Sequence, residues 1–334
     1  MRDYPKIKEY KYSGVLAELC EKFIAEKRAI GYLYNTEAKK LSEFSRFTLS
    51  FDIPPETLTE EVVQAWIEKK PMDSERNHYA RFSIINQFSG YMQRMGYSAY
   101  NLENMPKIRI RHKYTPYIFT HEEIRRFFTV ADSMKLKAKS VAPRRHLIMP
   151  VLFRLLYCCG LRMSEATQLR GEDVDFNDGI LTIRDSKFGK TRYVPMSSEI
   201  TTICAKYAET RLVTKEGDDW FFAAPDGGHY GEKGIYHTFR ELLWDAGISH
   251  GGRGKGPRVH DFRHTFCVHC LQKWVKQGKD LTNLLPRLTA YIGHSGFTET
   301  EQYLRMTAEV YPEISALMQE KYGYIIPRLE DMPL

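Results

Sequence analysis

Apolar residues recur at helical spacing along the first part of the chain, from Ser13 to about Gly96. Leu16 and Leu19, for example, stand on one face of the first expected helix, and the same period continues with interruptions. Thr59 is followed by two glutamates, which is typical of a helix start. The pattern predicts a bundle of roughly four helices beginning near residues 13, 36, 59 and 77, with nothing typical of an active site.

A second series of elements begins at Thr120, which forms a capping-box pattern with Glu123 and predicts a helix start. The apolar run 147–159 predicts a buried helix that ends at a sharp turn on Gly160. Arg162 then opens a short helix. The first strands are expected only after this point.

Alternation with a period of two replaces the helical period around residues 181–196. Leu181 and Ile183 alternate with polar residues, as do Val194 and Met196, which predicts two antiparallel strands joined by a hairpin at 187–190. Helices dominate again from residue 197. The chain is therefore expected to be mainly α, with a small antiparallel sheet in its second region.

A basic stretch with prolines at both ends separates the two regions. Its alternating cations predict an extended linker that follows a phosphate backbone, the alternative being a solvated charged loop. These cations are Lys107, Arg109, Arg111 and Lys113. The expected domains are 1–104, a linker at 105–118, and 119–334 with an amphipathic tail helix from about residue 308.

Composition narrows the class of protein. With 43% hydrophobic residues among 334, the chain can form two cores, and its net charge of +7 agrees with a nucleic-acid partner without requiring one. Its apolar stretches are too short to span a bilayer and its charged N-terminus does not resemble a secretory signal. We expect a cytoplasmic protein with reduced cysteines and no membrane association.

Cys267 and Cys270 have the spacing of half a zinc site, and His264 precedes them. No second cysteine pair has a matching spacing, so the segment is interpreted as a helix that buries Phe266 and Cys270. No metal site is predicted.

Five polar residues near the ends of separate segments form a pattern typical of a phosphate-binding site with a tyrosine nucleophile. They are Arg162, His260, Arg263, His294 and Tyr303. Guanidinium groups grip phosphoryl oxygens, and cations and hydrogen-bond donors stabilise a pentacoordinate phosphorus without a metal. A phenol of pKa about 10 needs such a positive setting to act as a nucleophile. Taken singly, each residue has a structural explanation, such as a local ion pair of Arg162 with Glu165.

Their order along the chain resembles the catalytic domain of the tyrosine recombinase, or phage integrase, family. The resemblance covers about residues 117–305 and includes Arg162, the hairpin lysine, His260-x-x-Arg263, Gly293-His294 and Tyr303. It implies a mostly helical catalytic domain with a three-stranded antiparallel sheet. The first region is similar in kind to the family's helical core-binding (SAM-like) domain. The chain resembles the two-domain type that has no arm-binding domain.

The resemblance also implies a role for each residue. Tyr303 would attack the scissile phosphate and form a 3′-phosphotyrosine, so no ATP, metal or other cofactor is required. Arg162 and Arg263 would hold the non-bridging oxygens, while His260 and His294 would donate hydrogen bonds or manage the tyrosine proton. Lys187 would protonate the leaving 5′ oxygen, with Lys190 as the alternative. Remaining roles are phosphate contacts for Lys190 and Arg192, and orientation of a catalytic side chain by Glu165.

Three functions are compatible with these residues. The first is a site-specific recombinase acting on double-stranded DNA as a tetramer, with the tail helix docked on a neighbouring subunit or on its own domain. The second is a type IB topoisomerase acting as a monomer, and the third a catalytically silent DNA-binding relative. The target sequence stays open, as does the biological role, whether dimer resolution, phage or cassette integration, or movement of a mobile genetic element.

Overall fold

Backbone contacts divide the chain into two units, residues 1–114 and 115–334. The computed structural model describes residues 7–102, 115–135, 144–186, 190–211, 220–224, 226–252, 256–293, 303 and 320. The division falls within the predicted linker at 105–118, most of which, residues 105–114, lies outside the described residues. Its use as a DNA-tracking linker stays a prediction.

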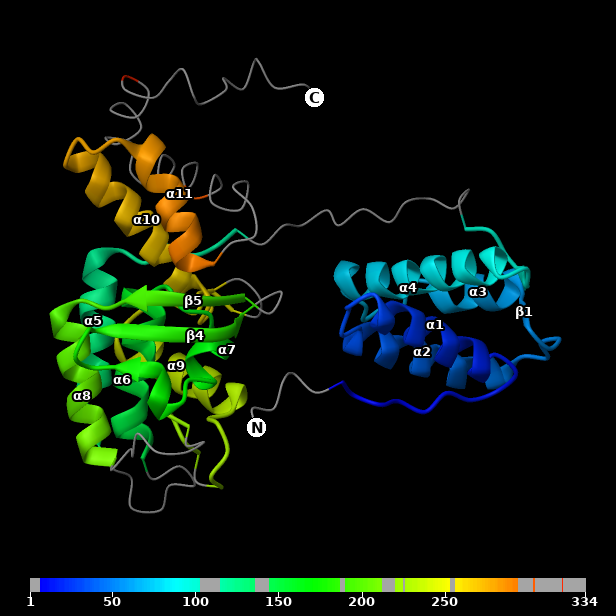
Figure 1. Cartoon of the computed structure of the whole chain (residues 1–334), viewed down its shortest axis with the longest axis horizontal. Helices are drawn as coiled ribbons and strands as arrows, with labels where there is room; N and C mark the ends of the chain where they lie inside the picture. The colour runs from blue at the N-terminus through cyan, green and yellow to red at the C-terminus, as the bar shows by residue number, and fades with distance from the viewer. Residues whose placement is uncertain are drawn as a thin grey trace. The chain divides into compact units, whose positions relative to one another are not determined.

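The first unit is a helical bundle, as predicted (Figure 1). Its helices are α1 (Ala17–Ala29), α2 (Asn35–Phe47), α3 (Glu60–Ile67) and α4 (Glu75–Arg94). Phe23 on α1 anchors the core, with its ring centroid 5.6 Å from Phe88 and 5.3 Å from Tyr91.

Short pieces that are not α-helical are the difference from the expected pattern. A 3-10 turn, η1, spans Thr48–Ser50, and strand β1 (Thr57–Leu58) pairs in parallel with β2 (Ser98–Ala99). Strands of two residues are too short to produce an alternating pattern, so periodicity did not reveal them.

The second unit is also mainly helical, with one three-stranded antiparallel sheet in the order β3-β4-β5. None of the helices in the described ranges is both long and apolar enough to cross a bilayer. The elements are α5 (His121–Asp132), α6 (Arg145–Cys158), α7 (Met163–Thr167), η2 (Gly171–Asp173), β3 (Val174–Asp175), β4 (Ile180–Ser186), β5 (Lys190–Pro195), α8 (Ser198–Arg211), α9 (Glu232–Asp245), α10 (Asp261–Lys276) and α11 (Leu281–Ile292).

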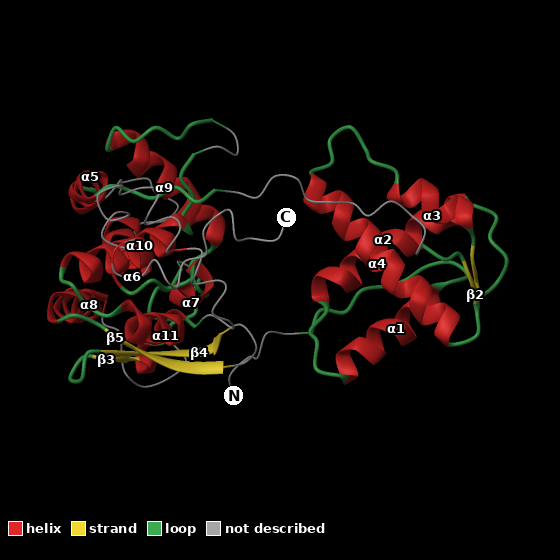
Figure 2. Ribbon diagram, turned by 90° about the horizontal axis from the view of Figure 1, so that it is seen from above, coloured by secondary structure: helices red, strands yellow, loops and turns green. Residues whose placement is uncertain are grey.

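The sheet lies along one edge of this unit, against the helices (Figure 2). Leu181 on β4 pairs with Val194 on β5, and both side chains are buried. Tyr193, which directly precedes Val194 on β5, is exposed on the opposite face of the sheet. Because side chains alternate across a strand, Arg192 shares the inner face with Val194. A cation on that face needs a partner inside the protein.

An aromatic core fixes the start of α10. The Phe262 ring is fully buried, with centroids 5.0 Å from Phe127, 5.6 Å from Phe239 and 5.9 Å from Phe153. Phe262 lies directly before Arg263, so this packing sets the direction in which the neighbouring polar side chains leave the helix. The predicted capping box of Thr120 and Glu123 is confirmed at the start of α5.

Candidate active site

A glycine turn places Arg162 at the start of α7. Gly160 has a φ of +60°, and a Cβ there would lie 2.6 Å from the Phe266 ring, so a larger residue is excluded by conformation and by space. The Glu165 carboxylate reaches back one turn. It accepts hydrogen bonds from the Arg162 backbone amide at 2.8 Å and from its Nη1 at 2.7 Å. The local ion pair considered from the sequence is therefore present.

Arg263 lies deeper, with only 1% of its surface exposed. Its Nη1 donates to the Gly160 carbonyl at 2.7 Å, and its Nη2 donates to the Ile292 carbonyl. Nη1 also lies 3.9 Å from the Glu165 carboxylate. Arg162 and Arg263, which are far apart in the sequence, thus share one counter-charge.

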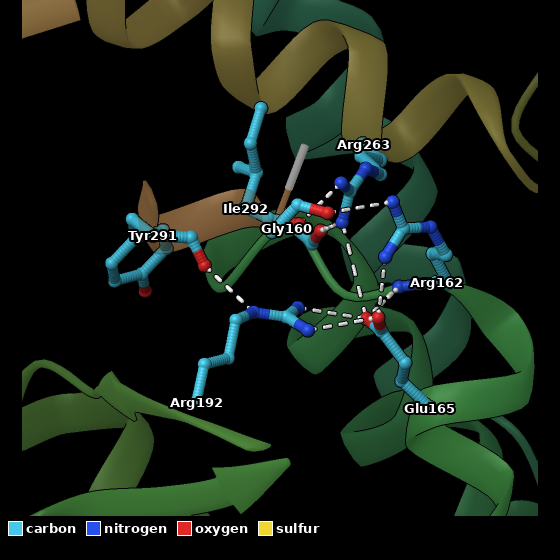
Figure 3. A network of polar contacts seen from close by, with 8 residues as sticks. Gly160, Arg162, Glu165, Arg192, Arg263, Tyr291 and Ile292 are labelled. Atoms are coloured by element: carbon cyan, nitrogen blue, oxygen red, sulfur yellow. Dashed lines mark hydrogen bonds and ion pairs between the residues drawn. The ribbon is translucent and has the colours of Figure 1, made fainter. Parts of the chain in front are cut away.

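Arg192 is the third cation on Glu165 (Figure 3). Its Nη1 and Nη2 donate to the two carboxylate oxygens at 2.9 and 2.8 Å, and its Nε donates to the Tyr291 carbonyl at 2.9 Å. This is the two-bond geometry that a guanidinium forms well and a lysine does not. The structure gives Arg192 these partners inside the protein, and a contact with DNA stays a prediction.

The carboxyl end of α11 meets all three arginines (Figure 3). Three successive carbonyls, of Tyr291, Ile292 and Gly293, accept from Arg192, Arg263 and Arg162 respectively. The last carbonyls of a helix have no partner within the helix and carry the negative end of its dipole, so cations stabilise them. Gly293 ends the helix in the left-handed conformation, with a φ of +69°. The arginines thereby hold the end of α11 in place at this site.

The charge of Glu165 is held by this cluster. Burial alone raises the pKa of its carboxyl, but hydrogen bonds and charge from Arg192, with the Arg162 amide and Arg263, lower that pKa to about 2. The folded state therefore binds this proton less readily than the unfolded state, whose carboxyl pKa is near the ordinary value. The stabilisation is complete above about pH 4.5 and is lost as the pH falls toward 2.

We accordingly expect the free energy of unfolding to fall more steeply between pH 5 and pH 3 in the wild type than in Glu165→Gln. Urea unfolding at several pH values, followed by tryptophan fluorescence, measures both slopes. Equal slopes in the two proteins would show that Glu165 carries no such linkage.

Tyr303 is buried against the face of α10, with 2% of its surface exposed. Its hydroxyl lies 3.1 Å from Nδ1 of His264. Burial and then the Cys267 thiol raise the pKa of the Tyr303 hydroxyl, while the charge and hydrogen bond of Arg263 lower it. The phenol is thus next to the buried guanidinium, and its role as a nucleophile stays a prediction.

His260 stands directly before α10 and remains exposed to solvent. Its ring lies edge to face with that of His264, at 4.8 Å between centroids. Partial desolvation, and then the charges of Arg263 and Arg162, lower the pKa of His260 to about 4. The ring is therefore neutral at pH 7, when it can donate through one nitrogen and accept through the other.

The structure brings together Arg162, Glu165, His260, Arg263 and Tyr303 among the residues that the sequence singled out. Several others lie outside the described residues, or have side chains that do. They are Lys187, Lys190, His294, Lys107, Arg109, Arg111 and Lys113.

Two contacts of the Tyr303 hydroxyl, with His264 and Cys267, were missed from the sequence. Helical spacing is the signal that reveals them, because positions 260, 263, 264 and 267 share one face of a helix. Alternation in β5 is the equivalent signal for the buried position of Arg192.

Cys267 and Cys270 both lie on α10, but the two side chains that were expected to be buried are only partly so. Cys267 is fully buried, whereas Phe266 and Cys270 are half-buried and line a cavity of about 520 Å³ beside His269. The direction of α10 is set by Phe262 and its neighbours, so Cys267 turns inward toward Tyr303. Within the described ranges, no group of three or more His, Cys, Asp or Glu side chains is placed to hold a metal ion.

The chain is similar to known proteins in its sequence and in its fold. A family model described as Phage integrase family matches residues 118–309. The chain is 28% identical over 310 residues to a putative integrase/recombinase, y4rB, of Sinorhizobium fredii, covering 90% of this chain and 96% of that protein. It is 27% identical over 246 residues to tyrosine recombinase XerC of Oceanobacillus iheyensis, covering 71% and 72%.

A solved structure of the XerH site-specific recombinase, bound to palindromic difH substrate in a post-cleavage complex, has a similar fold. The TM-score is 0.61 at 17% sequence identity, and the match covers 90% of this chain and 84% of that one.

Proposed function

The chain belongs to the phage integrase family, and from this premise we propose that it is a site-specific recombinase that cuts and rejoins DNA through a 3′-phosphotyrosyl intermediate. One observation carries the proposal. The Tyr303 hydroxyl lies beside the Arg263 guanidinium, in a site where Arg162 and Arg263 share the Glu165 carboxylate. A phenol held next to a converging pair of guanidinium groups is suited to attack on a phosphodiester.

In the proposed reaction, the Tyr303 oxygen attacks the scissile phosphorus and the 5′ oxygen leaves. Arg162 and Arg263 neutralise the charge that develops on the non-bridging oxygens. His260 and His294 supply further hydrogen bonds, and Lys187 or Lys190 protonates the leaving oxygen. The phosphotyrosine retains the energy of the broken bond, so a different 5′ hydroxyl can reverse the step without ATP or metal.

The proposed partner is double-stranded DNA with a specific recombination site. The XerH relative of similar fold is bound to its difH substrate. A net charge of +7 and the cations Lys107, Arg109, Arg111 and Lys113 agree with contacts to a phosphate backbone. Such contacts position a protein on the duplex, whereas base contacts select the sequence.

Assembly distinguishes the proposal from the alternatives. We propose that four subunits join two duplexes through the segment from about residue 308 and exchange strands through a Holliday junction. A topoisomerase of type IB would act as a monomer on one duplex. A catalytically silent relative would bind DNA without forming a covalent bond.

Incubation with nicked fragments of the genomic DNA that flanks the gene, in the presence of EDTA, tests the proposal. We expect a covalent protein–DNA complex whose junction maps the cleaved phosphate, and sedimentation of a four-subunit assembly on duplexes that carry the mapped site. A strict requirement for a divalent metal contradicts the mechanism. Cleavage by a species that stays monomeric on DNA favours the topoisomerase, and binding without cleavage favours the silent relative.

A further inference from the structure

One face of α10 carries more side chains capable of acid–base chemistry than the proposed reaction uses. His260, Arg263, His264 and Cys267 follow the spacing i, i+3, i+4 and i+7, which puts their side chains on one stripe. Tyr303 packs along this stripe. His260 and Arg263 have roles in the reaction proposed above, whereas His264 and Cys267 have none.

His264 contacts the oxygen that would attack phosphorus. Its Nδ1 lies 3.1 Å from the Tyr303 hydroxyl, within hydrogen-bonding range. The two rings are tilted by 51° with centroids 5.6 Å apart, so the contact is made through the ring nitrogen and the hydroxyl rather than by stacking of the rings. Cys267, one turn further along the helix, hydrogen-bonds the same hydroxyl.

The Tyr303 hydroxyl must lose its proton before or during attack. Burial is the largest cause that raises its pKa, and the charge of Arg263 opposes this shift without reversing it. The hydroxyl is therefore protonated at pH 7, and attack on phosphorus requires a group that accepts the proton.

Three described groups contact the hydroxyl, and they differ in their ability to accept its proton. Arg263 is permanently protonated and has no lone pair to offer. The pKa of the Cys267 thiol is raised to about 12, chiefly by burial, so the thiol keeps its proton. A neutral imidazole has one unprotonated nitrogen that can accept a proton. His264 is the suitable acceptor of the three.

We propose that His264 is a catalytic residue of this site, and that its Nδ1 accepts the Tyr303 proton as the phenolic oxygen attacks phosphorus. This inference rests on the proposed function. The O–H bond of Tyr303 breaks and its proton goes to Nδ1, while the Tyr303 oxygen bonds to phosphorus. The bond from phosphorus to the 5′ oxygen breaks with its electron pair, and that oxygen takes a proton from the lysine donor. In the reverse step His264 returns the proton to the phenol.

The surroundings suit this transfer. His260 meets His264 edge to face at 4.8 Å, and His260 is neutral at pH 7 because its pKa lies at about 4. His260 therefore adds no positive charge that would oppose the imidazolium that forms on His264. Cys267 gives the same hydroxyl a second hydrogen bond on α10.

Two substitutions separate proton transfer from positioning. In His264→Asn the amide oxygen can occupy the place of Nδ1 and keep the hydrogen bond, but it cannot take up a proton. His264→Ala removes both. On a duplex carrying the mapped site, we expect single-turnover phosphotyrosine formation to slow by about 100-fold or more in both variants. DNA affinity, measured separately, should stay within about threefold of the wild type, since no phosphate contact is removed.

His269→Asn is the matched control, because His269 lies on the same helix but stacks on His121, with 3.9 Å between ring centroids. It should cleave at the wild-type rate. Near-normal cleavage by His264→Asn alone would assign His264 to positioning and overturn the inference, as would normal cleavage by both His264 variants.

A substrate with sulfur in place of the bridging 5′ oxygen shows whether His264 takes the proton of Tyr303 or gives one to the leaving group. A thiol of pKa about 8.5 leaves without needing protonation, so this substrate relieves the loss of a proton donor but not of a proton acceptor. We expect His264→Asn to remain slow on it. Recovery to the wild-type rate would place His264 at the leaving group and contradict the inference. Absence of any tyrosyl adduct in the wild type would instead overturn the recombinase mechanism itself.

Discussion

Replacement of Tyr303 by phenylalanine is expected to abolish covalent attachment to DNA, with a loss of at least about 10⁴-fold, while duplex binding is nearly unchanged. The phenylalanine ring can keep the buried packing that Tyr303 has against α10 and α11. Only the attacking oxygen is missing. Protein–DNA complexes that survive denaturing electrophoresis measure attachment, and mobility shift at fixed salt measures binding.

Tyr207→Phe provides the control for this result. Tyr207 is also buried, and its hydroxyl donates to the Phe221 carbonyl at 3.0 Å. The substitution therefore removes a buried, hydrogen-bonded hydroxyl that has no role in the proposed reaction. This variant should still attach to DNA. Attachment that persists in Tyr303→Phe would exclude Tyr303 as the nucleophile.

Glu165→Gln is expected to produce the largest loss of stability, on the order of 3–5 kcal/mol, because it leaves buried guanidinium groups without their counter-charge. Arg192 has both terminal nitrogens on Glu165, and Arg263 is nearly inaccessible to solvent. Cleavage should fall as well, since the same carboxylate holds Arg162. Urea unfolding and single-turnover cleavage measure the two effects.

A double-mutant cycle shows whether the pair of Glu165 and Arg192 is responsible. Removing both charges in Glu165→Leu with Arg192→Leu should cost less than the sum of the single variants, by about 0.5–3 kcal/mol, because the two residues share hydrogen bonds. Additive losses would mean that Glu165 stabilises the unit by some other route.

The sequence predicts local structure well where a residue acts through its immediate neighbours. Thr120 with Glu123 forms the helix start that their spacing predicts, and Arg162 forms the local ion pair with Glu165 that was considered from theirs. These arrangements depend on one turn of helix, so the chain's own order is sufficient to predict them.

The sequence does not predict which distant segments meet. Arg192 was given a phosphate contact as a cation left on the hairpin once the lysine had its role, and nothing in that assignment indicates that its position on the inner face of β5 brings it to Glu165. The carbonyls of residues 291–293 carry no signal at all, because any residue type has a carbonyl group. Their role follows only from the point where α11 ends beside three cations.

His264 lies between these cases. Its spacing from His260 and Arg263 places it on the functional face of α10, which is visible in the sequence. Its contact with Tyr303 joins two segments separated by 39 positions, and that depends on how the chain folds back on α10. Helical spacing therefore indicates His264 as a candidate, and the tertiary structure shows that it contacts Tyr303.

Peptide mapping of the trapped protein–DNA complex by mass spectrometry tests the central claim most directly. The wild-type protein, after nuclease and protease digestion, should carry a nucleotide 3′-phosphate on the peptide that contains Tyr303, whose hydroxyl lies beside Arg263. An adduct on any other residue, or a cleaved DNA end with no attached peptide, would contradict the account.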